Sequence, residues 1–314
     1  MIFADYIPGL FTKLELLSPH PIMLLLTQAS WSEPPCRDAI LLKANRAYLG
    51  NVLHIHPPVS LSVDADSYFA HLGKQCGMEC VKNDYDFAQI LENRLEKMER
   101  LFLLVSRFEQ GVPSLGQRLA SIIRDISEGK YSDRFHVMLC GGEKLAALKY
   151  ENGSLSLLNL AKDEHWPELG RMEVYALGKH RFADLNLDDA LVDKLLEISG
   201  GHPQLLNKCL EFKAHFSELE LASYPAKLSQ CSEISQLFIP FKKTATPEQW
   251  GKWLKQDKLT EWQPYILDDH LRELYWKNAL VRREKDGKSG LYWRCEAIQM
   301  AGKKILGGGI LGTN

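Results

Sequence analysis

Short apolar runs alternate with helix-patterned segments through about the first 180 residues of this 314-residue chain, and this alternation limits the fold more than any other feature. Residues 101–105 (Leu-Phe-Leu-Leu-Val) form the clearest run, continuously apolar as expected for a parallel strand covered on both faces. Strands separated by helices imply right-handed crossovers. The sequence therefore predicts an α/β fold with an open, mostly parallel sheet and helices on both faces.

The pattern also predicts where each element lies. Strands are predicted at residues 22–27, 52–56, 101–105 and 135–140, with a fifth at 172–175. Helices with apolar residues at helical spacing are predicted at residues 37–49, 65–76, 84–100 and 113–127. Gly141 and Gly142 follow the fourth predicted strand, and we expect them to form a left-handed turn rather than an anion-binding site.

Strand patterns stop after about residue 180, and the rest of the chain is mainly helical in character. Helices are predicted at residues 187–198, 203–212, 234–241, 247–255 and 266–277, followed by a hairpin of residues 279–284 and 291–295 around a turn at 286–290. Helices followed by a two-stranded wing are typical of a winged helix-turn-helix. We therefore expect an α/β domain (1–180), a helical lid (181–230), a winged-helix domain (231–304) and a flexible tail (305–314).

Composition and charge narrow the class of protein. A hydrophobic content of 45% with 25% charged residues is ordinary for a globular protein and argues against a disordered or coiled-coil chain. The formal charge of −2 gives no global attraction to nucleic acid or anionic lipid. Seven scattered cysteines, no membrane-length apolar run and no secretion signal predict a cytoplasmic protein without a membrane segment. We expect no cofactor and no metal site, since His54 and His56 have no evident third ligand.

The order of several segments resembles the AAA+ and STAND group of P-loop NTPases, in members with an ATPase core, a small helical lid and a C-terminal winged helix. Residues 101–109 (LFLLVSRFE) look like a Walker B strand, and 135–145 resemble the next strand and sensor-1 turn, continuing to 155–159. Gly201-His202-Pro203 is similar to the Gly-x-Pro lid motif of STAND proteins. The resemblance spans about residues 15–300 and implies a P-loop NTPase-like fold.

The segment in the place of Walker A departs from the family pattern. The motif G-x-x-x-x-G-K-[ST] falls on residues 31–38 (Trp-Ser-Glu-Pro-Pro-Cys-Arg-Asp). Trp31 and Cys36 replace the glycines, Pro34 and Pro35 lie within the loop, and Arg37 and Asp38 replace the lysine and the hydroxyl residue. Proline has no N–H to donate to a phosphate, and a carboxylate adds repulsion. We therefore expect this loop not to hold a triphosphate in the usual way.

The Walker B strand departs independently. Hydrolysis in this group needs an Asp on magnesium and a neighbouring Glu that orients water. Ser106 and Arg107 stand at these positions, and Glu109 follows two residues later. We therefore predict that the chain has lost ATP hydrolysis and, with it, ATP binding. Gly201, His202 and Pro203 are candidates for a residual nucleotide contact, with helix punctuation as the alternative role.

Residues 231–304 carry 14 Lys/Arg and 10 Asp/Glu, a difference of +4. The candidate contact residues are Arg272 and Lys277 in the predicted recognition helix and Arg282, Arg283, Lys285, Lys288 and Arg294 in the predicted wing. The first turn of that helix, which begins at Ile266, contains Asp268 and Asp269, whose carboxylates would face phosphates if it entered a DNA groove. A protein partner is therefore favoured over DNA.

Three functions are compatible with these residues. The first is a non-catalytic AAA+/STAND-like interaction or regulatory protein whose partner is another protein, such as a catalytically competent ATPase. The second is a DNA-binding regulator that uses the winged helix. The third is an unconventional ATPase that uses Arg37, Asp38 and Glu109. The sequence leaves the oligomeric state and the pathway open.

Overall fold

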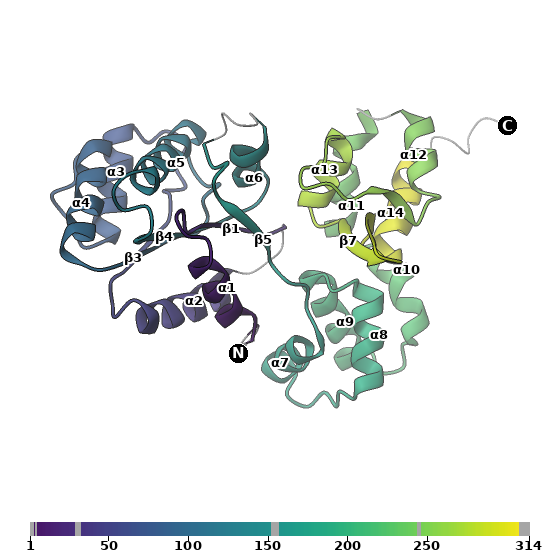
Figure 1. Ribbon diagram of the computed structural model, residues 1–314. Coiled ribbons are helices and arrows are strands. Elements are labelled where there is room, and N and C mark those ends of the chain that lie inside the picture. The colour runs from purple at the N-terminus through teal and green to yellow at the C-terminus, as the bar shows by residue number, and fades with distance from the viewer. Residues whose placement is uncertain (1–2, 4, 29–32, 152–156, 244–245, 308–314) are drawn as a thin grey trace. The chain divides into compact units, whose positions relative to one another are not determined.

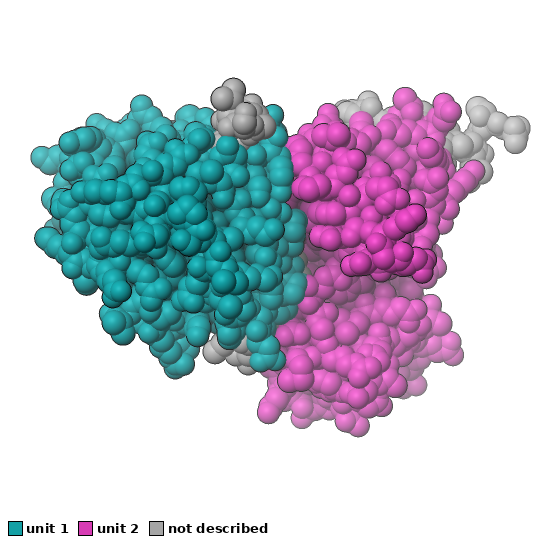
Figure 2. Space-filling view, in the orientation of Figure 1, with its two compact units in different colours: residues 1–27, 32–167 teal, residues 28–31, 168–314 magenta. Residues whose placement is uncertain are grey.

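The computed structural model describes residues 3, 5–28, 33–151, 157–243 and 246–307. The chain divides into two compact units (Figure 2), of which unit 1 comprises residues 1–27 and 32–167 and unit 2 comprises residues 28–31 and 168–314. Each unit has its own sheet. The predicted boundaries at residues 180 and 230 stay predictions.

Unit 1 is built on a five-stranded sheet. Its strands are β1 (Ile22–Leu26), β2 (Val52–Ile55), β3 (Leu101–Val105), β4 (Phe135–Gly141) and β5 (Lys162–His165). They lie in the order β2-β3-β4-β1-β5, and every neighbouring pair is parallel. Every residue of β1, β3 and β4 is buried, which is the reason for their continuous apolar runs. The predicted α/β class with a parallel open sheet is confirmed.

Helices cover both faces of this sheet. They are α1 (Tyr6–Glu15), α2 (Glu33–Ala47), α3 (Ala65–Gln75), α4 (Asp84–Lys97), α5 (Pro113–Glu128) and α6 (Glu143–Tyr150). Figure 1 shows α1 and α2 on one face and α3, α4 and α5 on the other. Asp64 and Asn83 fix the starts of α3 and α4, because their side chains accept hydrogen bonds from backbone N–H groups of the first turn.

The predicted fifth strand is wrong. Residues 172–175 lie in helix α7 (Arg171–Arg181), and Met172 is 77% exposed rather than buried in a sheet. The fifth strand is β5, whose sequence Lys-Asp-Glu-His contains no apolar residue. It lies at the edge of the sheet with β1 as its neighbour, so burial on both faces does not impose an apolar run on it.

Unit 2 contains helices and a small antiparallel sheet of order β6-β8-β7. After α7 its elements are α8 (Asp189–Ser199), α9 (Pro203–His215), η2 (Leu221–Ser223), α10 (Tyr224–Leu228), α11 (Ser232–Phe238), η3 (Pro240–Lys243), α12 (Pro247–Trp253), β6 (Lys258–Glu261), α13 (Asp269–Trp276), β7 (Leu280–Lys285), β8 (Lys288–Trp293) and α14 (Glu296–Gly307). Helix α14 packs against α10, α11 and α12. No helix in the described residues combines the length and the apolar character needed to cross a bilayer.

The hairpin that the sequence predicts is present, with two differences. Its turn is Asp286–Gly287, both with positive φ, instead of residues 286–290, because residues 288–290 already pair with β7. A third strand, β6, joins the hairpin.

The predicted tail begins too early, because residues 305–307 belong to α14; residues 308–314 lie outside the described residues. The winged helix-turn-helix assignment stays a prediction.

Candidate functional site

The candidate site lies at the carboxyl edge of the unit 1 sheet. Ile55 pairs with Val105 and Leu26 with Gly141, so β1, β2, β3 and β4 end at one edge. The residues that follow these strands are polar or glycine: Thr27, His56, Ser106 and Gly142. In a parallel α/β sheet this edge is where ligands bind.

Residues 33–38 of the segment predicted to correspond to Walker A form the start of helix α2. Trp31, and the side chains of Pro34, Pro35 and Cys36, lie outside the described residues. Because α2 begins at Glu33, the two prolines fall in its first turn. Helix N-termini bind phosphate through the free N–H groups of that turn, and a proline supplies none. Two of the first four residues of α2 therefore offer no donor to an anion.

Arg37 and Asp38 bind each other. The Nε and Nη2 atoms of Arg37 both donate to Oδ1 of Asp38, each at 3.0 Å. The cation predicted to stand in for the Walker lysine is thus neutralised by the next residue along the chain.

Ser106, predicted to stand in the place of the Walker B Asp, is buried and contacts a histidine. Its Oγ lies 2.8 Å from Nε2 of His54 on β2. Burial lowers the pKa of His54 to about 4, with smaller contributions from the charges of Arg37 and His56, so the imidazole is neutral at pH 7. This hydroxyl is therefore occupied by an internal hydrogen bond.

Two further histidines, His56 and His71, lie near this pair. The ring centroids of His54 and His56 lie 6.1 Å apart, and His71 of α3 lies 6.1 Å from His56. Burial lowers the pKa of His56, and the nearby charges of His71 and Arg107 add to the effect. Across the described residues, no group of three His, Cys, Asp or Glu side chains has the arrangement of a metal site.

Arg107 is the residue predicted to stand at the position of the Walker B Glu. Its φ of +52° lies in the left-handed region, and its side chain is exposed. This conformation turns the chain after β3 so that Phe108 becomes buried and donates its N–H to the carbonyl oxygen of Cys140 at 3.0 Å. A cation cannot act as the base that orients water.

Glu109 is bonded to the start of helix α6. Its Oε1 accepts the backbone N–H groups of Lys144 at 2.5 Å and Leu145 at 3.2 Å. The N-cap residue of α6 is Gly142, which has no side chain to do this. Glu109 therefore caps α6 from a different loop and holds its negative charge at the positive end of the helix.

The expected left-handed turn at Gly141 and Gly142 is wrong, because neither has a positive φ. The close approach of neighbouring atoms explains instead why residue 142 is a glycine. A Cβ added to Gly142 would lie 2.9 Å from the carbonyl oxygen of Thr27 and 3.3 Å from Oε2 of Glu109. The glycine thus leaves room for the Glu109 cap.

The candidate lid residues of unit 2 serve helix ends. Gly201 has a φ of +68° just after α8, and Pro203 is the first residue of α9. His202 is 5% exposed, and its Nδ1 accepts the N–H groups of Gln204 and Leu205 at 3.2 and 3.4 Å. Burial lowers the pKa of His202 to about 3, and the charge of Arg294 contributes. A nucleotide contact by this motif stays a prediction.

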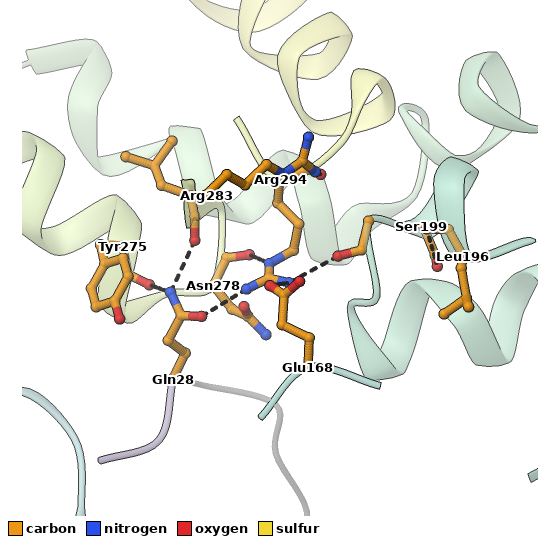
Figure 3. A network of polar contacts seen from close by, with 10 residues as sticks. Gln28, Glu168, Leu196, Ser199, Tyr275, Asn278, Arg283 and Arg294 are labelled. Carbon is orange, nitrogen blue, oxygen red and sulfur yellow. Dashed lines mark hydrogen bonds and ion pairs between the residues drawn. The ribbon is translucent and has the colours of Figure 1, made fainter. Parts of the chain in front are cut away.

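The prediction that Arg294 belongs to a binding surface is wrong. Its side chain is 1% exposed and lies at the centre of a polar network (Figure 3). The guanidinium donates to Glu168 Oε1 at 2.9 Å, to Gln28 Oε1 at 2.7 Å and to the carbonyl oxygens of Gly200 and Asn278 at 2.9 and 3.2 Å. No sequence signal links these four positions to Arg294, since the contacts span 16 to 266 residues.

Gln28 completes the same network. Its amide nitrogen donates to the carbonyl oxygens of Tyr275 at 2.5 Å and Leu280 at 2.9 Å, while its oxygen accepts from Arg294. All of these residues belong to unit 2. Gln28 therefore connects the end of α13 and the first residue of β7 to the buried guanidinium.

Most other cations predicted as contacts have protein partners. Arg272 pairs with Asp269 at 2.6 Å, Lys277 pairs with Glu273, Lys285 pairs with Asp257 at 2.8 Å, Arg283 donates to the carbonyl oxygen of Arg294 at 2.8 Å, and Arg282 bonds Ser289 at 3.1 Å. Lys288, at the start of β8, is exposed. The charges of α13 are therefore largely balanced within the helix.

Comparison with known proteins finds similarity to solved structures, but not to a family model or a curated protein. Similar structures include the ORC2 protein of Aeropyrum pernix in its ADP form (11% identity, TM-score 0.49, covering 98% of this chain and 94% of that one) and CDC6P of Pyrobaculum aerophilum (12%, 0.44, 98% and 94%). The Aeropyrum pernix ORC1 protein in complex with DNA is a third (11%, 0.34, 97% and 93%). With TM-scores below 0.5, these similarities carry no conclusion about what this chain binds.

Proposed function

We propose that this chain is a non-catalytic AAA+/STAND-like protein that acts as an interaction or regulatory module and neither hydrolyses nor binds ATP. One observation carries the proposal: the polar side chains at the carboxyl edge of the sheet are bonded to the protein itself. Ser106 contacts His54, and Glu109 caps α6. Hydrolysis needs a carboxylate on magnesium and another on water, and the end of β3 offers neither.

The start of α2 supports the same proposal from the phosphate side. Prolines remove two of the backbone donors of its first turn, and Arg37 is paired with Asp38. A phosphate placed there would have to displace Asp38 from Arg37 and would then lie beside an unpaired carboxylate. This arrangement also argues against an unconventional ATPase built on Arg37, Asp38 and Glu109.

Calorimetric titration of the full chain with magnesium-ATP, together with a phosphate-release assay, tests the proposal. We expect no saturable binding in the micromolar range and turnover at the background rate. Arg37→Ala should leave that background unchanged, as should the matched control Arg46→Ala in the exposed part of the same helix. Micromolar affinity, or turnover that Arg37→Ala abolishes and Arg46→Ala does not, would contradict the proposal.

A protein is the partner that unit 2 supports best. Helix α13 begins with Asp268, which caps it, and Asp269, which pairs with Arg272. Leu267, just before them, is 74% exposed. An acidic helix start beside an exposed leucine suits a protein surface better than a phosphate backbone. A catalytically competent ATPase is the partner that would supply the missing activity.

The exposed cation Lys288 and the neighbouring Arg282 favour DNA binding by the hairpin as a second candidate function. Mobility-shift titrations with DNA at several salt concentrations distinguish the protein-binding module from the DNA-binding regulator. A protein-binding module should show weak binding that is insensitive to Lys288→Ala. A steep loss of binding with salt that becomes less steep in Lys288→Ala would favour the DNA-binding regulator.

A further inference from the structure

Unit 2 contains a cavity that the proposed function does not use. Its volume is about 550 Å³, and it lies among α8, α10, β7 and the start of α14. Cavities of roughly 300–1,000 Å³ are typical of small-molecule sites. The cavity is therefore large enough for an organic ligand rather than for a single ion.

The residues that line the cavity are of two kinds. Ile198 on α8, Leu221, Pro225 on α10 and Trp293 on β8 supply apolar surface. Positive charge comes from Lys255 just after α12, from Arg283 on β7 and from Lys303 on α14. A ligand that matches both must carry an apolar body and a negative group.

Several other charged residues of the lining are already neutralised. Lys194 pairs with Glu197 at 2.7 Å, Asp257 pairs with Lys285 at 2.8 Å, and Arg294 pairs with Glu168 at 2.9 Å. These pairs leave no net charge to a ligand.

The cations that remain exceed the acids. Among the described residues, Lys255, Arg283 and Lys303 have no carboxylate within ion-pair distance. Glu296 is the one acid of the lining that likewise has no cation within ion-pair distance among those residues. Three positive charges less one negative charge leave +2. Arg283 is also held in place, because it donates to the carbonyl oxygen of Arg294 at 2.8 Å.

We propose that this cavity binds a small organic phosphate, with the phosphate at Lys255, Arg283 and Lys303 and a ring or other apolar body against Ile198 and Trp293. A phosphate monoester carries a charge near −2 at neutral pH, which matches the excess. An arginine held in place favours two-pronged contact with phosphate oxygens. Inorganic phosphate would leave the apolar surface uncovered and should bind more weakly.

Calorimetry on the full chain at low salt tests the proposal with 1-naphthyl phosphate and inorganic phosphate as probes. We expect naphthyl phosphate to bind about tenfold or more tightly than inorganic phosphate, because of the apolar area it buries. The double variant Lys255→Glu/Lys303→Glu should weaken naphthyl phosphate binding by about tenfold or more. The matched control Lys252→Glu/Lys304→Glu changes two exposed lysines nearby that do not line the cavity, and it should bind as the unchanged protein does.

A second measurement needs no substitution. Naphthyl phosphate should protect Lys255 and Lys303, but not Lys252 and Lys304, from chemical acetylation. Absence of naphthyl phosphate binding, equal weakening in both double variants, or equal acetylation of all four lysines would overturn the proposal. A glutamate-rich peptide that requires Lys255 and Lys303 and is not displaced by naphthyl phosphate would also overturn it, in favour of an acidic protein segment.

Discussion

At the scale of single residues, polar side chains that the sequence marks as functional serve the protein's own structure. Ser106 and Glu109 were identified because they follow the apolar run of β3. Their partners could not be identified in this way, since His54 lies 52 positions away and Lys144 lies 35 positions away. Spacing along the chain shows where a strand ends but not which side chain meets the residue that follows.

Glu109→Ala should lower the free energy of unfolding of the full chain by about 1 kcal/mol, because two N–H groups of α6 lose their acceptor. Urea denaturation measures the change. Glu79→Gln alters an exposed glutamate of the same unit and serves as the control, expected to stay within about 0.5 kcal/mol. Equal effects of the two substitutions would show that the cap contributes no stability.

Glu168→Gln should destabilise the protein by about 2 kcal/mol, because Arg294 stays charged and buried while its anionic partner is removed. The amide can still accept one hydrogen bond, so the loss should be smaller than that for Glu168→Ala. Glu218→Gln, at an exposed position of the same unit, provides the comparison and should have little effect. The urea midpoint distinguishes them, and an unchanged midpoint for Glu168→Gln would disprove the role of the ion pair.

At the scale of elements, the sequence predicts those whose side chains follow a simple period. Strands β1, β3 and β4 are buried throughout and were found by their apolar runs. Strands β5 and β6 lie at sheet edges and are largely polar, so no such run marks them. The glycine and proline signals between α8 and α9 predict the helix ends correctly, because these residues act through local backbone geometry.

Gly200→Ala should destabilise the protein by more than about 2 kcal/mol. The residue has a φ of +60°, and an added Cβ would lie 2.2 Å from the carbonyl oxygen of Arg294. Gly251→Ala, in α12 with no atom within 4 Å of the added Cβ, should instead stabilise by about 0.5 kcal/mol. Thermal unfolding of both variants checks the prediction, which fails if Gly200→Ala unfolds at the temperature of the unchanged protein.

At the scale of the whole molecule, buried histidines link stability to pH. Burial lowers the pKa values of His54 to about 4 and of His202 to about 3, and it also lowers that of His136. The unfolded chain takes up these protons near pH 6.5, before the folded chain does. Stability should therefore be fully present above about pH 6.5 and decrease as the pH falls toward 4.

His202→Asn should reduce this pH dependence, because asparagine can still cap α9 but does not titrate. Between pH 6.5 and 4 we expect the variant to lose about 2 kcal/mol less stability than the unchanged protein. His180→Asn replaces an exposed histidine of the same unit and should keep the original slope. Urea unfolding at a series of pH values measures both, and parallel slopes for all three proteins would contradict the assignment to His202.

The sequence by itself determined the α/β class and the main buried strands and helices, because these depend on local periodicity and residue type. Tertiary structure alone decided that Arg294 is buried, that Glu109 caps α6 and that the cavity beside α14 carries unpaired positive charge. Whether a side chain is paired depends on groups brought together from distant parts of the chain. Periodicity does not encode which distant groups come into contact, and only the folded backbone decides this.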